Sequence, residues 1–85
     1  MITKNERDKM KKILTSYVQE VKEYLQNQGI TNKQGNPYSD IYIVSVFNGV
    51  RENIDIEKAI LTIYERKLRA IDDLNEEKQK LLNKN

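Results

Sequence analysis

The last third of the chain, from Ile56 to Asn85, contains neither glycine nor proline. Because these two residues are the strongest local breaks in a helix, nothing in this stretch signals a turn. Asn53 and Asp55 can each cap a helix start, and we predict one helix over about residues 55–82. At about 1.5 Å per residue this helix would be about 40 Å long. That is more than a domain of 85 residues can cover.

The apolar side chains of this helix follow the ladder of a coiled coil. The spacing alternates between four and three residues at Ile60, Tyr64, Lys67, Ile71, Leu74, Lys78 and Leu81. Two of these positions are lysine, so the ladder is imperfect, but the alternation is that of the a and d positions of paired helices. The sequence leaves open whether the helix is straight or folds back near Asn75. We predict a homodimer whose contacts are made by Tyr64, Lys67, Ile71, Leu74, Lys78 and Leu81.

The first third predicts a second long helix. Apolar residues recur there at spacings of three and four, which is typical of one amphipathic helix: Met10, Ile13, Leu14, Tyr17, Val18, Val21, Tyr24 and Leu25. Thr3 followed by Glu6 matches a capping box at its start, and Gly29 suits the left-handed conformation in which many helices end. We predict a helix over about residues 4–28, followed by a loop over residues 29–38.

The stretch from Tyr38 to Arg51, YSDIYIVSVFNGVR, fits two different structures. Its β-branched and aromatic residues, followed by Asn48 and Gly49, are typical of a strand that runs into a hairpin. As a strand, however, it would have two largely apolar faces, and the flanking helices could cover only one of them.

A helix accounts for more of the same residues. Ser39 can cap its start, and Asp40 lies in the first turn, where the helix dipole favours an anion. The residues that would face inward at helical spacing are Ile43, Val46, Phe47 and Val50. A β-branched residue costs only about tenths of a kcal/mol in a helix relative to alanine, whereas burying a large apolar side chain contributes about 1.5–3 kcal/mol. We therefore predict a helix over residues 39–48 that stops at Gly49.

Two stretches carry a resemblance to a known family. The second stretch follows the first along the chain and is IEKAI, at residues 56–60. The first stretch consists of Ser39, Ile43, Val46, Phe47, Asn48, Gly49 and Arg51. They are similar to the serine-capped recognition helix ending in VLNG-R, and to the helix after it, in helix-turn-helix DNA-binding domains of the phage-repressor and lactose-repressor type. The resemblance covers about residues 38–64. It implies that residues 39–48 enter the major groove of DNA.

The resemblance also implies which side chains meet the DNA. Asn48 can pair with adenine, Ser45 can bond to a base edge, and Ile41 can contact a thymine methyl group. The predicted DNA-binding residues are Lys33, Tyr38, Ser39, Asp40, Ile41, Tyr42, Ser45, Asn48 and Arg51. The chain departs from the family in its long loop before Ser39, in the negative charge of Asp40, and in having no arginine or lysine within residues 39–48.

Composition narrows the classes of function. The chain has no histidine and no cysteine, so the usual general base and thiol nucleophile are missing. We therefore predict no enzyme activity and no cofactor. We also predict no metal site, because the acidic residues 72–77 fit ordinary surface ion pairs. The N-terminal residues do not resemble a signal peptide, and no apolar run approaches the roughly 20 residues of a membrane span. Both observations favour a cytoplasmic protein. The net charge of +2 identifies no partner.

Taken together, these features predict a single all-α domain over residues 1–85, in which two long helices frame a short recognition helix. The predicted function is a small DNA-binding transcriptional regulator that acts as a dimer on double-stranded DNA. An alternative is a protein-interaction module that uses Ile41, Val44 and the C-terminal helix. A third is an assembly protein held together by the coiled coil.

Overall fold

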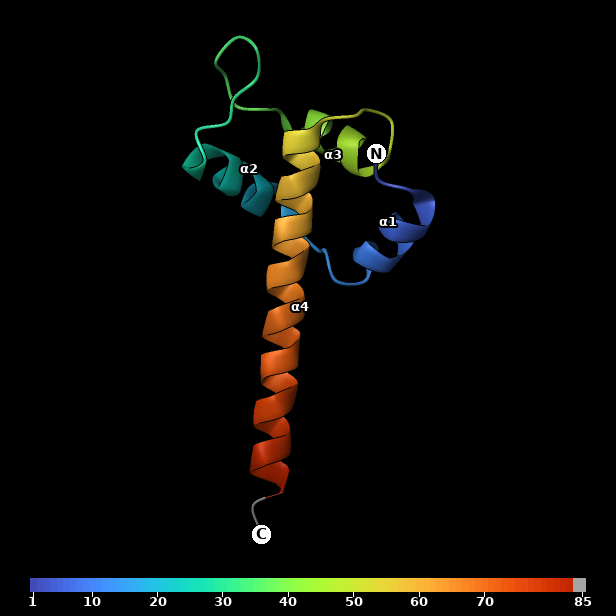
Figure 1. The fold of residues 1–85 in the computed structure, drawn as a ribbon, viewed down its shortest axis with the longest axis vertical. Coiled ribbons are helices and arrows are strands. Elements are labelled where there is room, and N and C mark those ends of the chain that lie inside the picture. The colour runs from blue at the N-terminus through green and yellow to red at the C-terminus, as the bar shows by residue number, and fades with distance from the viewer. Residues whose placement is uncertain (84–85) are drawn as a thin grey trace.

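Four helices make up the computed structural model, which describes residues 1–83. They are α1 (Lys4–Lys11), α2 (Tyr17–Asn27), α3 (Asp40–Phe47) and α4 (Ile54–Leu82), and no strand occurs among the described residues. The predicted all-α fold is confirmed, including a helix where the alternative was a strand. The shorter helices gather around the N-terminal half of α4, whose C-terminal half extends away from them (Figure 1).

Side-chain caps start three of the four helices. Thr3 and Glu6 form the capping box predicted for the first helix. The Ser39 hydroxyl accepts a hydrogen bond from the Tyr42 backbone N–H at 3.2 Å, and the Asn53 side chain accepts one from the Ile56 N–H at 3.1 Å. Each bond satisfies one of the amide groups that a helix leaves without a partner in its first turn.

Glycines end α2 and α3 in the predicted way. Gly29 and Gly49 both have positive φ, at 69° and 77°. After α3, the Val50 N–H bonds to the Ser45 carbonyl and the Gly49 N–H to the Val46 carbonyl, which is the pairing of a Schellman motif. The left-handed turn directs Val50 away from the core, so this residue, predicted to face inward, is instead 77% exposed.

The predicted single helix over residues 4–28 is instead two helices, α1 and α2. The chain leaves helical geometry after Lys11, and Ser16 takes a left-handed φ of 54° before α2 begins. With the chain broken in this way, Met10 and Leu14 both reach the core, where they are 3% and 6% exposed. A straight helix of this length would carry those side chains away from a small core. The apolar spacing alone cannot distinguish the two arrangements, because it continues across the break.

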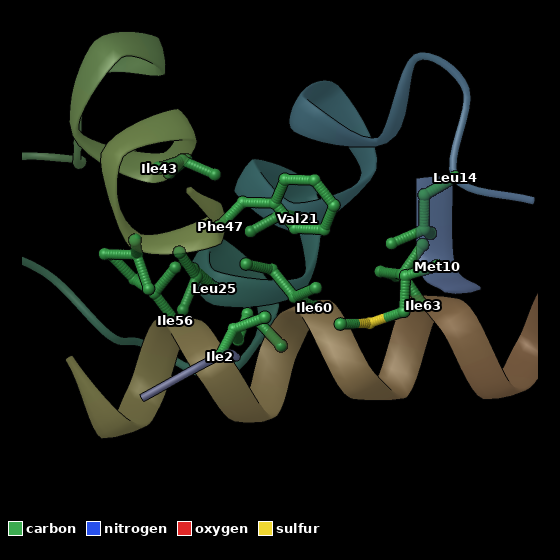
Figure 2. Close-up of a cluster of buried hydrophobic side chains, with 12 residues drawn as sticks. Ile2, Met10, Leu14, Val21, Leu25, Ile43, Phe47, Ile56, Ile60 and Ile63 are labelled. Carbon is green, nitrogen blue, oxygen red and sulfur yellow. The ribbon is translucent and has the colours of Figure 1, made fainter. Parts of the chain in front are cut away.

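The core lies between α4 and the three shorter helices. Its buried side chains are Ile2, Met10, Leu14, Val21, Leu25, Ile43, Val46, Phe47, Ile56, Ala59, Ile60 and Ile63. Figure 2 shows side chains of the shorter helices converging on the face of α4 that carries Ile56, Ile60 and Ile63. The three tyrosines on the apolar stripes, Tyr17, Tyr24 and Tyr64, pack against this core but remain partly exposed.

α4 is continuous from Ile54 to Leu82, so the chain does not fold back near Asn75. It accounts for the elongated shape of the protein, whose extents are 59 × 28 × 17 Å. Among the described residues, no helix has both the length and the apolar content needed to cross a membrane.

Candidate DNA-binding surface

The packing of α3 separates a buried face from an exposed one. Ile43 and Val46 are fully buried and Phe47 is 4% exposed. The Phe47 ring lies 5.0 Å from the ring of Tyr17, and burial raises the pKa of the Tyr17 hydroxyl above its usual value. On the opposite face Ile41 is 80% exposed. The short helix is therefore seated firmly and presents one side to solvent.

Arg7 of α1 fixes the C-terminal end of α3. Its Nε donates to the Phe47 carbonyl at 3.0 Å, and its Nη2 donates to the Asn48 carbonyl at 2.6 Å. These carbonyls belong to the last turn of the helix, where a cation is favoured by the helix dipole. This role of Arg7 is not predicted from the sequence, because its two partners are about 40 residues away along the chain. No local pattern signals such a contact.

The negative charge of Asp40 is balanced by α2. Lys22 Nζ lies 2.7 Å from Asp40 Oδ1 in an exposed ion pair. The pair also links the start of α3 to the middle of α2. Together with Arg7 at the other end, it ties α3 to both preceding helices.

Three of the predicted base-reading residues lie on or beside the exposed face of α3. Ile41 is the most exposed of them, and Asn48 is exposed at the end of the helix. The Ser45 hydroxyl donates to the Ile41 carbonyl at 2.8 Å, so it can offer only its oxygen lone pairs to a ligand. No hydrogen bond engages the Asn48 side-chain amide within residues 1–83. Asn48 thus keeps both a donor and an acceptor for a partner.

Tyr38, Tyr42 and Arg51 form a stack beside α3. The two tyrosine rings are 4.9 Å apart, and the Arg51 guanidinium lies 5.1 Å from the centre of the Tyr42 ring. The Tyr38 hydroxyl accepts a hydrogen bond from the Asn53 amide at 3.2 Å, and Asn53 in turn caps α4. The Tyr38 oxygen still has a proton to donate. The stack therefore joins the start of α3 to the start of α4 while holding a cation at the surface.

Lys33 lies in a turn closed by its own hydrogen bonds. The Asn32 side chain accepts from the backbone N–H groups of Gln34 and Asn36, at 3.0 Å each, and the Gly35 N–H bonds to the Asn32 carbonyl. A hollow of about 600 Å³ separates this turn from the tyrosine stack. Four of the predicted residues line the hollow: Lys33, Tyr38, Ser39 and Tyr42.

The structure thus divides the predicted DNA-binding residues between two neighbouring surfaces. One is the hollow with the adjacent stack, which carries Lys33 and Arg51. The other is the exposed face of α3. The Ser39 side chain caps α3, which gives it a local structural role in addition to its place in the hollow.

The predicted dimer contacts are also divided. Tyr64 packs against the core of its own chain. Lys67 donates to the Thr15 carbonyl at 3.2 Å and lies 3.2 Å from a Glu20 carboxylate oxygen. Both residues therefore serve the packing of the monomer. The other four predicted residues are exposed along the C-terminal half of α4: Ile71, Leu74, Lys78 and Leu81.

Comparisons of the chain with protein-family models, with curated proteins and with solved structures give no match.

Proposed function

We propose that the protein is a small DNA-binding transcriptional regulator of the cytoplasm, which binds double-stranded DNA through the exposed face of α3 and pairs with a second copy of itself. The observation that supports this most directly is the way α3 is held. One face is buried at Ile43 and Val46, both ends are tied to α1 and α2, and Ile41 on the opposite face is 80% exposed. A rigid helix with an open face is what major-groove recognition requires.

The exposed residues offer a limited set of base contacts. The Asn48 amide suits adenine, which presents an acceptor and a donor side by side in the major groove. Ile41 suits the methyl group of thymine. Ser45 would accept from an amino group of adenine or cytosine, because its own proton is bonded to the Ile41 carbonyl. We therefore expect a preference for sites rich in A·T pairs.

Phosphate contacts would come from the sides of α3. Arg51 lies over Tyr42, and Lys33 stands on the far side of the hollow. Backbone contacts of this kind set the position of a protein on DNA, whereas base contacts set its specificity. The ion pair of Asp40 with Lys22 reduces the repulsion that the Asp40 carboxylate would otherwise exert on the DNA backbone.

The direct test is to titrate a fluorescent random duplex at low salt and follow its anisotropy. Even nonspecific DNA-binding proteins bind under these conditions, with dissociation constants on the order of micromolar. The Lys33→Ala, Arg51→Ala double variant should bind more weakly and reduce the slope of log K against log salt by about two. The control is Arg69→Ala with Lys80→Ala, which removes the same charge from the exposed C-terminal half of α4. Absence of binding at micromolar protein, or equal losses in both double variants, would contradict the proposal.

A second candidate function is favoured by the apolar character of the same face. Ile41 and Val44 are 80% and 37% exposed, and an exposed apolar patch on a helix also suits a protein partner. Under this function Ile41→Glu should abolish the partnership without affecting the fold, since Ile41 is outside the core. The Lys33→Ala, Arg51→Ala variant should then have little effect.

A further inference from the structure

One face of α4 is buried in the first half of the helix and exposed in the second half. In the N-terminal half this face carries Ile56, Ile60 and Ile63, all buried against the shorter helices. It continues through Lys67, which contacts Thr15 and Glu20. Steps of three and four residues, at about 100° per residue, keep later side chains on the same side of a helix. The residues that continue this face are Ile71, Leu74, Lys78 and Leu81.

This continuation is uncovered within the described chain. Ile71 is 43% exposed, Leu74 51% and Leu81 69%. The part of α4 concerned is residues 69–82, here called the free half, and every residue in it is exposed. The rest of the described protein, residues 1–68, is called the body. A row of apolar side chains left open on a projecting helix is typical of an interface.

We propose that a second copy of the chain covers this row, with the two free halves packed antiparallel. The free half contains four acidic and three basic residues, so it has no strong net charge that would call for an oppositely charged partner. The row itself has the alternating spacing with which one helix packs against another of its kind.

The position of the body decides the orientation. The free half and the body use the same face of α4, so a partner helix on that face runs directly toward the body. In a parallel pair, the axes of the two α4 helices would be about 8–10 Å apart along their length. Both bodies would then need to occupy the narrow space between those helices. In an antiparallel pair each body lies beyond the end of the partner's α4, and no such overlap arises.

The lengths of the two parts also define the register. The partner's helix can advance along the free half only until its end meets the body, near the connection between α1 and α2 (Figure 1). The two free halves then overlap fully, with the twofold axis near Asn75. Ile54, where α4 starts, lies 21 residues from Asn75, which corresponds to about 31 Å of helix. The two α4 starts would therefore be about 60 Å apart.

This orientation changes what is expected of a DNA complex, a consequence that rests on the proposed function. Each α3 packs near the start of its α4, so the two α3 helices would lie at opposite ends of the dimer. Their separation would be closer to two turns of DNA, about 68 Å, than to the single turn of about 34 Å of adjacent half-sites. The pairing itself is a property of the protein alone and is tested without DNA.

Sedimentation velocity with three variants tests the interface. Leu74→Glu should raise the dimer dissociation constant by at least about tenfold, because it places a charge in the apolar row of both chains. Gln79→Glu is the matched control, since it adds the same charge to the free half outside the row, and should leave the constant within about threefold. Lys78→Leu should lower the constant by completing the row. A wild-type protein that stays monomeric at about 100 µM, or equal effects of the two glutamates, would overturn the proposal.

Distances between spin labels test the orientation. The chain has no cysteine, so Lys58→Cys provides one labelling site per chain on the exposed side of the body. Lys58 is 17 residues from Asn75, and an antiparallel pair predicts a label separation of about 50 Å, from twice the 1.5 Å rise over that length. A parallel pair predicts a separation below about 30 Å. The shorter distance would overturn the antiparallel arrangement.

Discussion

Arg7 offers a sharp test of how α3 is held in place. It is the residue of α1 whose guanidinium donates to the carbonyls of Phe47 and Asn48, at 3.0 and 2.6 Å. Arg7→Ala removes both bonds and leaves the end of α3 without its cation. A hydrogen bond to a charged group contributes about 1.5–3 kcal/mol when it is shielded from water. The bond to Phe47 is partly buried, whereas the bond to Asn48 is exposed, so the combined loss should be about 2–3 kcal/mol.

Urea unfolding followed by far-UV circular dichroism measures this loss. For a protein of this size the free energy of unfolding falls by about 1 kcal/mol per molar urea, so the midpoint should fall by about 2–3 M. Arg7→Lys should recover only part of the stability, because a single ammonium group cannot span two carbonyls as the guanidinium fork does. Lys9→Ala is the matched control on the same helix. Lys9 is exposed, and its loss should change the stability by less than about 0.5 kcal/mol. Equal midpoints for Arg7→Ala and Lys9→Ala would refute the role given to Arg7.

Three further predictions concern local geometry and are checked by the same unfolding assay. Ser16→Gly should stabilise the protein by up to about 1 kcal/mol, because Ser16 has a φ of 54° and makes no capping bond with its side chain; a loss of stability would contradict this. Gly49→Ala should destabilise the protein by more than about 1 kcal/mol, because residue 49 has a φ of 77° and an added Cβ would lie 2.8 Å from Arg7 Nη2. The loss should be smaller in an Arg7→Ala background, and an equal loss in both backgrounds would contradict the clash. Hydrogen bonds from Thr3 hold the pKa of Glu6 below its usual value of 4.5, so the stability that the charged form contributes is complete above about pH 4.5 and is lost as the pH falls through the lowered pKa. The difference between the wild type and Glu6→Gln should shrink below that pH, and a constant difference would contradict the assignment.

The candidate site shows where prediction from the sequence stops. The sequence predicts Ile41 and Val44 on the outer face of the short helix, because Ile43, Val46 and Phe47 fill the inward positions. Their exposed fractions of 80% and 37% confirm this. The ion pair of Asp40 with Lys22 and the anchoring of α3 by Arg7 join residues from different helices. Sequence spacing gives no information about such partners, because they meet only after the helices have packed.

The sequence by itself determined which segments are helical and where most of them end. Ser39 and Asn53 supply hydrogen bonds within one turn of their own position, and Gly49 adopts a conformation that side chains disfavour. These are local effects, so a linear sequence is enough to predict them. Only the tertiary structure decided that the chain breaks at Ser16, that Arg7 holds α3, and that one half of α4 is buried while the other projects. A chain of 85 residues can bury only a limited apolar surface. Which apolar side chains are buried is therefore decided by how all the helices pack together, and not by any single segment.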